Sequence, residues 1–354
     1  MKVAPVYAAL RARGLAVRLV HTGQHYDDKM STVFFDDLGM PRPDAFLGVG
    51  SGSHAEQTAK IMTLFERECV DWRPDLVLVA GDVNSTIACA LVASKLGIAV
   101  GHIEAGLRSR DWAMPEEINR VLTDHASDLL LTPSRDGDAN LLAEGIPAWR
   151  IAFVGNCMID SLRTHEARAV SLQPWRDYGL DPGGYAVATL HRPSNVDEPG
   201  QLAALVGALA QVAEQLPVLF PVHPRTAARM RSAGLQAPAG LQVVEPLGYL
   251  QFLGVMARAK VVATDSGGIQ EETTALGVPC LTLRANTERP VTMLEGTNTL
   301  LGTDPKRLGP AVAEVIAGRG KAGRVPEGWD GRAAERIADL VAGGIDTLLE
   351  RSTP

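Results

Sequence analysis

The amino-acid sequence predicts an α/β protein with two Rossmann-like, doubly wound domains that follow one another along the chain. Continuous apolar runs recur throughout, with helical patterns between them, and such runs are typical of parallel strands covered on both faces. At 354 residues the chain is long enough for two domains that each bury a core. The alternation starts again after the segment LQPWRDYGLDPGG, which predicts domains over residues 1–165 and 166–332.

Apolar runs predict the strands of both domains: LAVRLVHT, DLVLVAGD, GIAVGHIEAG, DLLLTPS and RIAFVGN, then YAVATLH, PVLFPVH, LQVVEP, KVVATDSGG and VPCLTLR. A helix is expected from Ser53 to Trp72, because Ser53 is a good N-cap residue. Another is expected from Asn84 to Leu96, since the following Gly97 is typical of a helix C-terminus.

The two ends of the sequence are both helical in pattern. A helix over about residues 331–350 carries an apolar stripe and is expected to pack on a domain surface, although the pattern leaves open which one. The stripe consists of Ile337, Leu340, Val341, Ile345 and Leu348. At the other end, MKVAPVYAALRARG stands where a domain of this topology has its central first strand. We therefore expect the natural chain to start upstream, with a strand that fills the centre of the first sheet.

The formal net charge of −7, without a cluster of Lys and Arg, argues against a nucleic-acid or anionic-membrane surface. No apolar run approaches the roughly 20 residues of a bilayer span. The N-terminus lacks the apolar core and cleavage site of a signal peptide, so a cytoplasmic protein is expected. Four cysteines stand far apart without a Cys-x-x-Cys pair, which favours buried reduced thiols: Cys69, Cys89, Cys157 and Cys280.

Polar side chains follow several predicted strands. Because ligands bind beyond the carboxyl ends of the strands in open α/β sheets, these side chains form the candidate site. They are Asp82, Glu104, His191, His223 and the segment Asp265–Gly268. Asp82 could instead cap the helix that begins near Asn84, and each histidine could lie satisfied in the core. No metal site is expected, because neither histidine has a ligand partner at suitable spacing.

Two further acids, Glu116 and Glu117, stand after Pro115 at a predicted helix start. Their structural interpretation is favourable interaction with the helix N-terminus, with a surface pair between Glu116 and Arg120. Glu104 is harder to explain in this way, because its glycine-flanked turn has little helix to cap.

The segment TDSGGIQEETTALG suggests an anion site. Gly267 and Gly268 would expose backbone N–H groups to a phosphate at a helix N-terminus, and Glu272 could accept two ribose hydroxyls. Ser-Gly-Gly is also ordinary turn chemistry. The motifs of P-loop ATPases and of nicotinamide enzymes are both missing from the sequence.

Along nearly its whole length the sequence resembles the non-hydrolysing UDP-N-acetylglucosamine 2-epimerases. The matching pieces are KVAP, TGQHYD, DLVLVAGDVNST, VGHIEAGLRS, MPEEINR, FVGNCMIDSL, TLHRPSNVD, FPVHP, DSGGIQEE and TERP. The resemblance implies the two-domain glycosyltransferase-B fold, with residues 333–354 crossing back to complete the first domain. It also implies a homodimer that needs no metal or redox cofactor.

The resemblance implies reversible C2 epimerisation of UDP-N-acetylglucosamine to UDP-N-acetylmannosamine, by elimination and re-addition of UDP. The matching catalytic residues are Asp82, Glu104, Glu116 and His191, while Glu117 is expected to be structural. The matching UDP and substrate contacts are Lys2, Phe252, Ser266, Gly267, Gly268, Glu272 and Arg289. A possible second, regulatory nucleotide-sugar site matches Gln24, His25, Arg192 and His223.

Two other functions remain open at this stage, because a fold does not settle function. One is a sugar transferase with the glycosyltransferase-B fold, and the other is a nucleotide-sugar-binding protein without turnover. A neighbouring UDP-sugar, such as a diacetamido uronic acid, is an alternative substrate.

Overall fold

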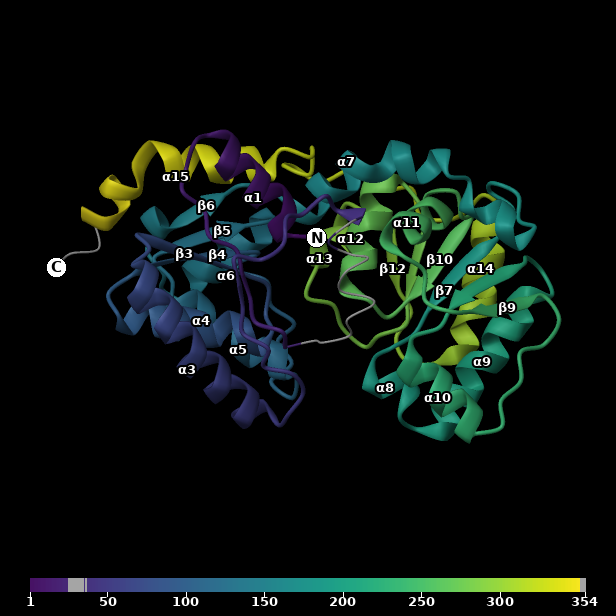
Figure 1. Cartoon of the computed structure of the whole chain (residues 1–354). Coiled ribbons are helices and arrows are strands. Elements are labelled where there is room, and N and C mark those ends of the chain that lie inside the picture. Colours follow the sequence, from purple (N-terminus) through teal and green to yellow (C-terminus); the bar gives the residue numbers. More distant parts are fainter. Residues whose placement is uncertain (25–34, 36, 351–354) are drawn as a thin grey trace. The chain divides into compact units, whose positions relative to one another are not determined.

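The computed structural model describes residues 1–24, 35 and 37–350 and divides the chain into two compact units (Figure 1). The first unit comprises residues 1–161 and 327–354, and the second comprises residues 162–326. Each unit contains a parallel sheet with helices packed on it, which confirms the predicted α/β class. The side chains of residues 345–350 are outside the description, so Ile345 and Leu348 of the predicted stripe are not placed.

The main sheet of the first unit has the strand order β3-β4-β5-β6, with all neighbours parallel. Its strands are β3 (Leu76–Ala80), β4 (Ala99–Ile103), β5 (Leu129–Thr132) and β6 (Ile151–Phe153). A separate parallel pair is formed by β1 (Val20–His21) and β2 (Ala45–Phe46). β4 and β5 are buried at every residue, as continuous apolar runs predict for strands covered on both faces.

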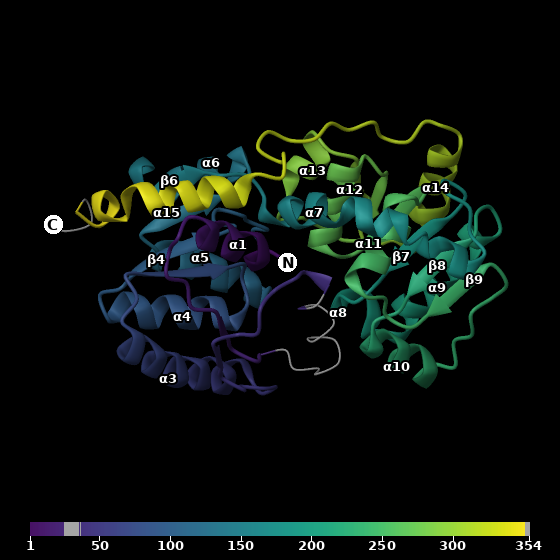
Figure 2. The same cartoon turned by 45° about the horizontal axis from the view of Figure 1, so that its top comes forward.

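Helices cover both faces of this sheet. One core joins α1 (Val3–Ala12) and the C-terminal α15 (Ala333–Glu350) to β4 and β5, and Figures 1 and 2 show these two helices side by side. A second core joins α3 (His54–Trp72) and α4 (Asn84–Lys95) to β3 and β4. α5 (Pro115–Ala126) packs beside α4. The first unit is therefore completed by the C-terminal end of the chain.

Local sequence signals account for several helix ends. Ser53 caps α3 as predicted, because its Oγ accepts from the N–H of Glu56 at 3.2 Å while Glu56 Oε2 accepts from the Ser53 N–H at 3.1 Å. α15 starts where Asp160 accepts from the N–H groups of Ala333, at 3.1 Å, and Ala334, at 2.6 Å. This buried carboxylate fastens the C-terminal helix to the first unit.

The second unit has a six-stranded parallel sheet in the order β12-β11-β10-β7-β8-β9. Its strands are β7 (Ala186–Thr189), β8 (Val218–Pro221), β9 (Leu241–Val244), β10 (Val261–Thr264), β11 (Cys280–Thr282) and β12 (Asn298–Leu300). Its helices are α8 (Pro193–Val196), α9 (Pro199–Ala213), α10 (Pro224–Ser232), α11 (Tyr249–Ala257), α12 (Gly267–Leu276), α13 (Pro290–Leu294) and α14 (Leu308–Ile316). Two further α-helices of the described residues are α6 (Arg135–Ala143) and α7 (Cys157–Ser171).

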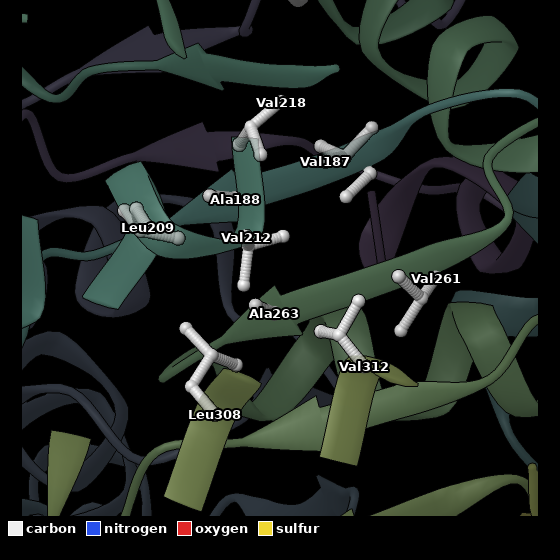
Figure 3. A pocket seen from close by; sticks show the side chains of 10 residues that line it. Val187, Ala188, Leu209, Val212, Val218, Val261, Ala263, Leu308 and Val312 are labelled. Atoms are coloured by element: carbon white, nitrogen blue, oxygen red, sulfur yellow. The ribbon is translucent and has the colours of Figure 1, made fainter. Parts of the chain in front are cut away.

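The core of the second unit lies between its sheet and the helices α9, α10 and α14. Figure 3 shows a small cavity in this core, lined by apolar side chains of β7, β8, β10, α9 and α14. Ligand sites combine apolar walls with a few polar groups, so we assign this apolar cavity to the core rather than to a ligand site.

The four cysteines are buried and unpaired, as the sequence predicts. Burial raises the pKa of Cys69 and of Cys280 to about 11. None of the helices in the described part of the chain has both the length and the apolar character needed to cross a membrane.

Glycine is required sterically where the turn after β4 meets α6. Gly106 has φ +81°, and a Cβ there would lie 2.5 Å from the carbonyl oxygen of Gly137. Gly97 has a similar φ of +72°, but a Cβ there would meet nothing within 4 Å. We expect Gly97→Ala to lower the free energy of unfolding by about 1 kcal/mol, from backbone strain alone. Gly106→Ala should lower it by about 3 kcal/mol or more, because overpacking adds to that strain.

Urea denaturation of both variants and the wild type measures the difference. Equal losses in the two variants would contradict the close packing of this turn on α6.

Candidate active site

Glu104, at the carboxyl end of β4, combines a strained backbone with a buried carboxylate. Its φ of +74° is in the left-handed region, which a non-glycine residue adopts at an energetic cost. The backbone is held there by the Glu104 N–H, which donates to the carbonyl of Leu131 at 3.0 Å. The side chain is only 7% exposed and pairs with Lys2 Nζ. Strain of this kind at a carboxylate is typical of a functional position.

A fully buried His102–Asp124 pair ties the turn after β3 to the turn after β4. His102 Nδ1 lies 2.6 Å from Asp124 Oδ1, and Nε2 lies 2.8 Å from the carbonyl oxygen of Gly81. Asp124 Oδ2 accepts from the Gly106 N–H at 3.1 Å and pairs with Arg108 Nη1 at 2.7 Å. Burial alone would raise the pKa of Asp124, but His102 and Arg108 together lower it below its usual value.

Asp82 follows β3 and is directed toward α5. Its carboxylate pairs with the buried guanidinium of Arg120, while its carbonyl oxygen accepts from Asn119 Nδ2 at 3.0 Å. The N-cap position of α4 belongs to Val83, which makes no side-chain cap. The alternative in which Asp82 caps this helix is therefore wrong, because its carboxylate pairs across to α5 instead.

Glu116 and Glu117 differ in their surroundings. Glu116 is half-buried, whereas Glu117 is buried and accepts from the N–H groups of Ser109, at 2.9 Å, and Arg110, at 2.8 Å. Glu117 also accepts from Arg120 Nη1 at 2.9 Å. The expected surface pair of Glu116 with Arg120 is wrong, since Arg120 is buried between Glu117 and Asp82. Glu117 lies in the first turn of α5, as the helix-end interpretation expects, and it also contacts the preceding loop.

In the second unit, His191 after β7 is oriented by Asp265 after the adjacent strand β10. His191 Nδ1 lies 2.8 Å from Asp265 Oδ1, and 43% of the His191 side chain is exposed. Asp265 also accepts from the backbone N–H groups of His191 and Arg192 and from Asn195 Nδ2. Burial would raise the pKa of Asp265, but the hydrogen bonds with His191 and its neighbours lower it. With Nδ1 engaged, the histidine presents Nε2 for chemistry.

The N-terminus of α12 has a paired arginine beside it. Ser266 is the N-cap, and Gly268 follows Gly267 in the first turn. A Cβ on Gly267 would lie 2.4 Å from Arg289 Nη1, so only glycine allows the guanidinium to approach the helix so closely. Arg289 is held by two carboxylates, because its Nε lies 2.9 Å from Glu271 and its Nη1 lies 2.5 Å from Glu288. A helix N-terminus with a fixed guanidinium can bind an anion such as a diphosphate.

Glu272 is buried one turn further along α12. Its Oε1 accepts from the hydroxyl of Tyr249 on α11 at 3.2 Å. Burial raises the pKa of Glu272 to about 8, although the Tyr249 hydrogen bond lowers it. Phe252, the expected uracil-side residue, is half-buried on the same helix α11.

The described residues of the possible regulatory site each contact their own unit. Gln24, in the first unit, accepts from the N–H of Ser85 at 2.8 Å through its Oε1. In the second unit, Arg192 Nη2 lies 3.7 Å from Glu288, and His223 caps α10. His25 lies outside the described residues. The regulatory site stays a prediction.

Sequence reasoning missed two residues that orient the candidates, Arg120 and Tyr249. Arg120 was expected at the surface, whereas Asp265 was among the candidates because of its position at a strand end. Nothing local marked Tyr249, which lies 23 residues before its partner Glu272.

Comparison with known protein families gives a match over residues 8–342 to the model described as UDP-N-acetylglucosamine 2-epimerase. The chain is 40% identical to the UDP-N-acetylglucosamine 2-epimerase of Methanocaldococcus jannaschii, with 97% of this chain and 96% of that protein covered. It is also 40% identical to the UDP-2,3-diacetamido-2,3-dideoxy-D-glucuronate 2-epimerase of Pseudomonas aeruginosa, with 95% and 94% covered.

Solved structures of UDP-GlcNAc 2-epimerases also match the fold of this chain. The structure of the M. jannaschii UDP-GlcNAc 2-epimerase in complex with UDP-GlcNAc and UDP matches with a TM-score of 0.90 at 39% identity, covering 97% of this chain and 96% of that one. The Neisseria meningitidis UDP-GlcNAc 2-epimerase bound to UDP-GlcNAc matches with a TM-score of 0.88 at 28% identity, with the same coverage.

The buried carboxyl of Glu272 makes stability depend on pH. Its pKa is raised from 4.5 to about 8 in the folded chain, so the unfolded chain loses this proton first as the pH rises. The contribution of Glu272 to stability is therefore present below about pH 4.5 and is lost progressively up to about pH 8. We expect the melting temperature of the wild type to fall more steeply over this range than that of Glu272→Gln, in scanning calorimetry.

The exposed Glu214, at the end of α9, offers a matched control. Glu214→Gln should keep the wild-type slope. A Glu272→Gln variant with the same slope as the wild type would show that this carboxyl is ionised throughout.

Proposed function

The chain belongs to the UDP-N-acetylglucosamine 2-epimerase family, and we propose that it interconverts UDP-N-acetylglucosamine and UDP-N-acetylmannosamine. The observation that carries this proposal is the family match over residues 8–342, supported by relatives of 40% identity over nearly the full length. The proposed reaction removes the C2 proton while the C1–O bond to UDP breaks, which leaves a C1=C2 double bond. UDP and a proton then add back, with the proton on the opposite face.

Reaction on two faces of the sugar needs more than one acid–base group. We assign these roles to Asp82, Glu104, Glu116 and His191. Glu104 has its carboxylate fixed by a strained backbone and by Lys2, while Asp82 has its carboxylate fixed by Arg120. Asp265 holds His191 in the tautomer whose Nε2 is available to the substrate.

We assign UDP binding to residues of the second unit and propose Lys2, which pairs with Glu104, as a further substrate contact. The α12 N-terminus and Arg289 provide positive potential for the diphosphate, through Ser266, Gly267 and Gly268. Glu272 would accept the ribose hydroxyls, and Phe252 would lie beside the uracil. Gln24, His25, Arg192 and His223 are proposed as a second nucleotide-sugar site. A nucleotide-sugar substrate fits the expected cytoplasmic location.

A second substrate is supported by one observation. The relative from P. aeruginosa, which acts on a UDP-diacetamido sugar acid by its name, has the same 40% identity as the relative from M. jannaschii. The same elimination at C1 and C2 would serve both substrates. Parallel assays with the two UDP-sugars discriminate between them by kcat/KM.

Incubation with UDP-N-acetylglucosamine in deuterated water tests the reaction. We expect deuterium at C2 and UDP-N-acetylmannosamine as product, without any acceptor. Asp82→Asn, Glu104→Gln, Glu116→Gln and His191→Asn should each lower turnover by about a hundredfold or more, because each removes an acid–base group. NMR of the C2 position measures both quantities.

Sugar transfer that requires an acceptor would instead indicate a glycosyltransferase, and binding without exchange would indicate a binding protein. Wild-type rates in two or more of the four variants would remove the catalytic assignment.

We also propose a homodimer that pairs through α5. This helix exposes apolar side chains one turn apart, since Ile118 is 41% exposed and Leu122 is 52% exposed, and Trp112 before it is 65% exposed. The face of α5 that packs on its own unit is polar and includes Glu117 and Arg120. The apolar face is exposed, and an exposed apolar patch is typical of a protein–protein interface. A second copy of the chain offers the same apolar face to this one, as a two-fold interface requires.

Light scattering after size exclusion tests this assembly. Leu122→Glu should convert a dimer to a monomer, because it buries a charge in the apolar interface. Leu142→Glu, at a similarly exposed leucine on α6, is the matched control and should leave the dimer intact. A wild type that runs as a monomer would overturn the assembly.

A further inference from the structure

Glu117, in the first turn of α5, makes several hydrogen bonds to the loop before the helix. One oxygen, Oε1, accepts from the Arg110 N–H at 2.8 Å. The other, Oε2, accepts from Ser109 through its N–H and its Oγ, both at 2.9 Å, and from Arg120 Nη1 at 2.9 Å. The side chain is 2% exposed, so water does not compete for these bonds. The attraction between its charge and Arg120 is therefore screened less than that of an exposed pair.

Arg120 connects Glu117 to Asp82. Its guanidinium is 3% exposed and uses Nη1 for Glu117 and Nη2 for Asp82. A planar guanidinium held on one side by a buried carboxylate can turn little, so its second nitrogen is fixed in direction. The carboxylate of Asp82, which is 25% exposed, therefore meets a donor whose position Glu117 determines.

The backbone of Asp82 is held by contacts that do not involve Glu117. The position of the backbone and the direction of the side chain therefore have different causes. Asn119 Nδ2 donates to the carbonyl oxygen of Asp82 at 3.0 Å and lies 3.3 Å from Asn84 Oδ1. Asn84 is held in turn by Gln57 at 2.8 Å. These contacts place the turn after β3 without Glu117. What Glu117 adds is the direction of the Asp82 carboxylate.

We propose that Glu117 is a positioning residue for the epimerisation, which fixes the Asp82 carboxylate through Arg120. This inference rests on the proposed function and on the role assigned there to Asp82. It also gives Glu117 a part in turnover, beyond the structural role that the sequence predicts. A purely structural Glu117 would hold the loop at Ser109 and Arg110 and would have no specific link to Asp82.

A double-mutant cycle on Glu117 and Asp82 tests the proposal. Glutamine at position 117 keeps an acceptor oxygen for the loop but removes the charge that holds Arg120. Glu117→Gln should lower kcat by about tenfold or more, with the Kd for UDP within about twofold of the wild type. In an Asp82→Asn background the same change should lower kcat by less than about twofold further, because the carboxylate that Glu117 positions is already gone.

Arg120→Lys provides a second route if Glu117→Gln folds poorly. Lysine keeps the charge but cannot reach both carboxylates with a planar fork. Its effect on kcat should likewise disappear in the Asp82→Asn background. Melting temperatures identify any variant whose loss of activity comes from unfolding.

Glu144→Gln is the matched control. Glu144 pairs with the buried Arg108 at 2.7 Å and supports the same loop, but its described partners do not include Asp82. Its effect on kcat should be the same with and without Asp82→Asn.

Losses for Glu117→Gln that multiply with those of Asp82→Asn would overturn the positioning role while leaving the epimerase assignment intact. Wild-type kcat in Glu117→Gln would also overturn it. A wild type without C2 exchange would overturn the proposed function, and this inference with it.

Discussion

The positions of the candidate site residues in the first unit depend on the contacts of one buried carboxylate, that of Asp124. It joins His102, Arg108 and the Gly106 N–H, and His102 reaches on to the carbonyl of Gly81. Nδ1 of this ring faces the Asp124 carboxylate and Nε2 faces the Gly81 carbonyl oxygen, so the ring bridges α5 and the turn after β3. Asp82 follows Gly81 directly, and Glu104 lies on the turn that Gly106 continues. One buried charge network therefore sets the spacing of both strand ends.

α5 supplies this network because its amphipathic character is reversed. Its buried positions are Glu117, Arg120, Thr123 and Asp124, whereas Ile118 and Leu122 face outward. A surface helix normally buries its apolar stripe. Here the polar stripe lies against the strand ends, where Asp82 and the turn after β4 provide charged and backbone partners. The same reversal leaves the apolar stripe exposed, so the candidate site and the proposed dimer both involve this one helix.

The sequence was sufficient for the fold class, because burial on both faces leaves continuous apolar runs and caps such as Ser53 act locally. The strand-end rule likewise located Asp82, Glu104 and His191. The sequence could not show which residues pair when they lie far apart along the chain. Asp265 lies 74 residues from His191, and Arg120 lies 38 residues from Asp82. The usual rule that charged helical residues face water placed Arg120 at the surface, and α5 breaks that rule.

Two buried carboxyls of the second unit show how the number of hydrogen-bond donors affects the pKa of a carboxyl group. Asp265 accepts from two backbone N–H groups, from Asn195 and from His191, so its pKa is lowered and it remains a charged partner for the ring. Glu272 has the Tyr249 hydroxyl as its described donor, and its pKa is raised to about 8. Donors to a carboxylate favour its ionised form. Under the proposed assignment of Glu272 to the ribose, the bound sugar would bring two hydroxyl donors to this carboxyl, which would favour its ionisation and couple proton release to nucleotide binding.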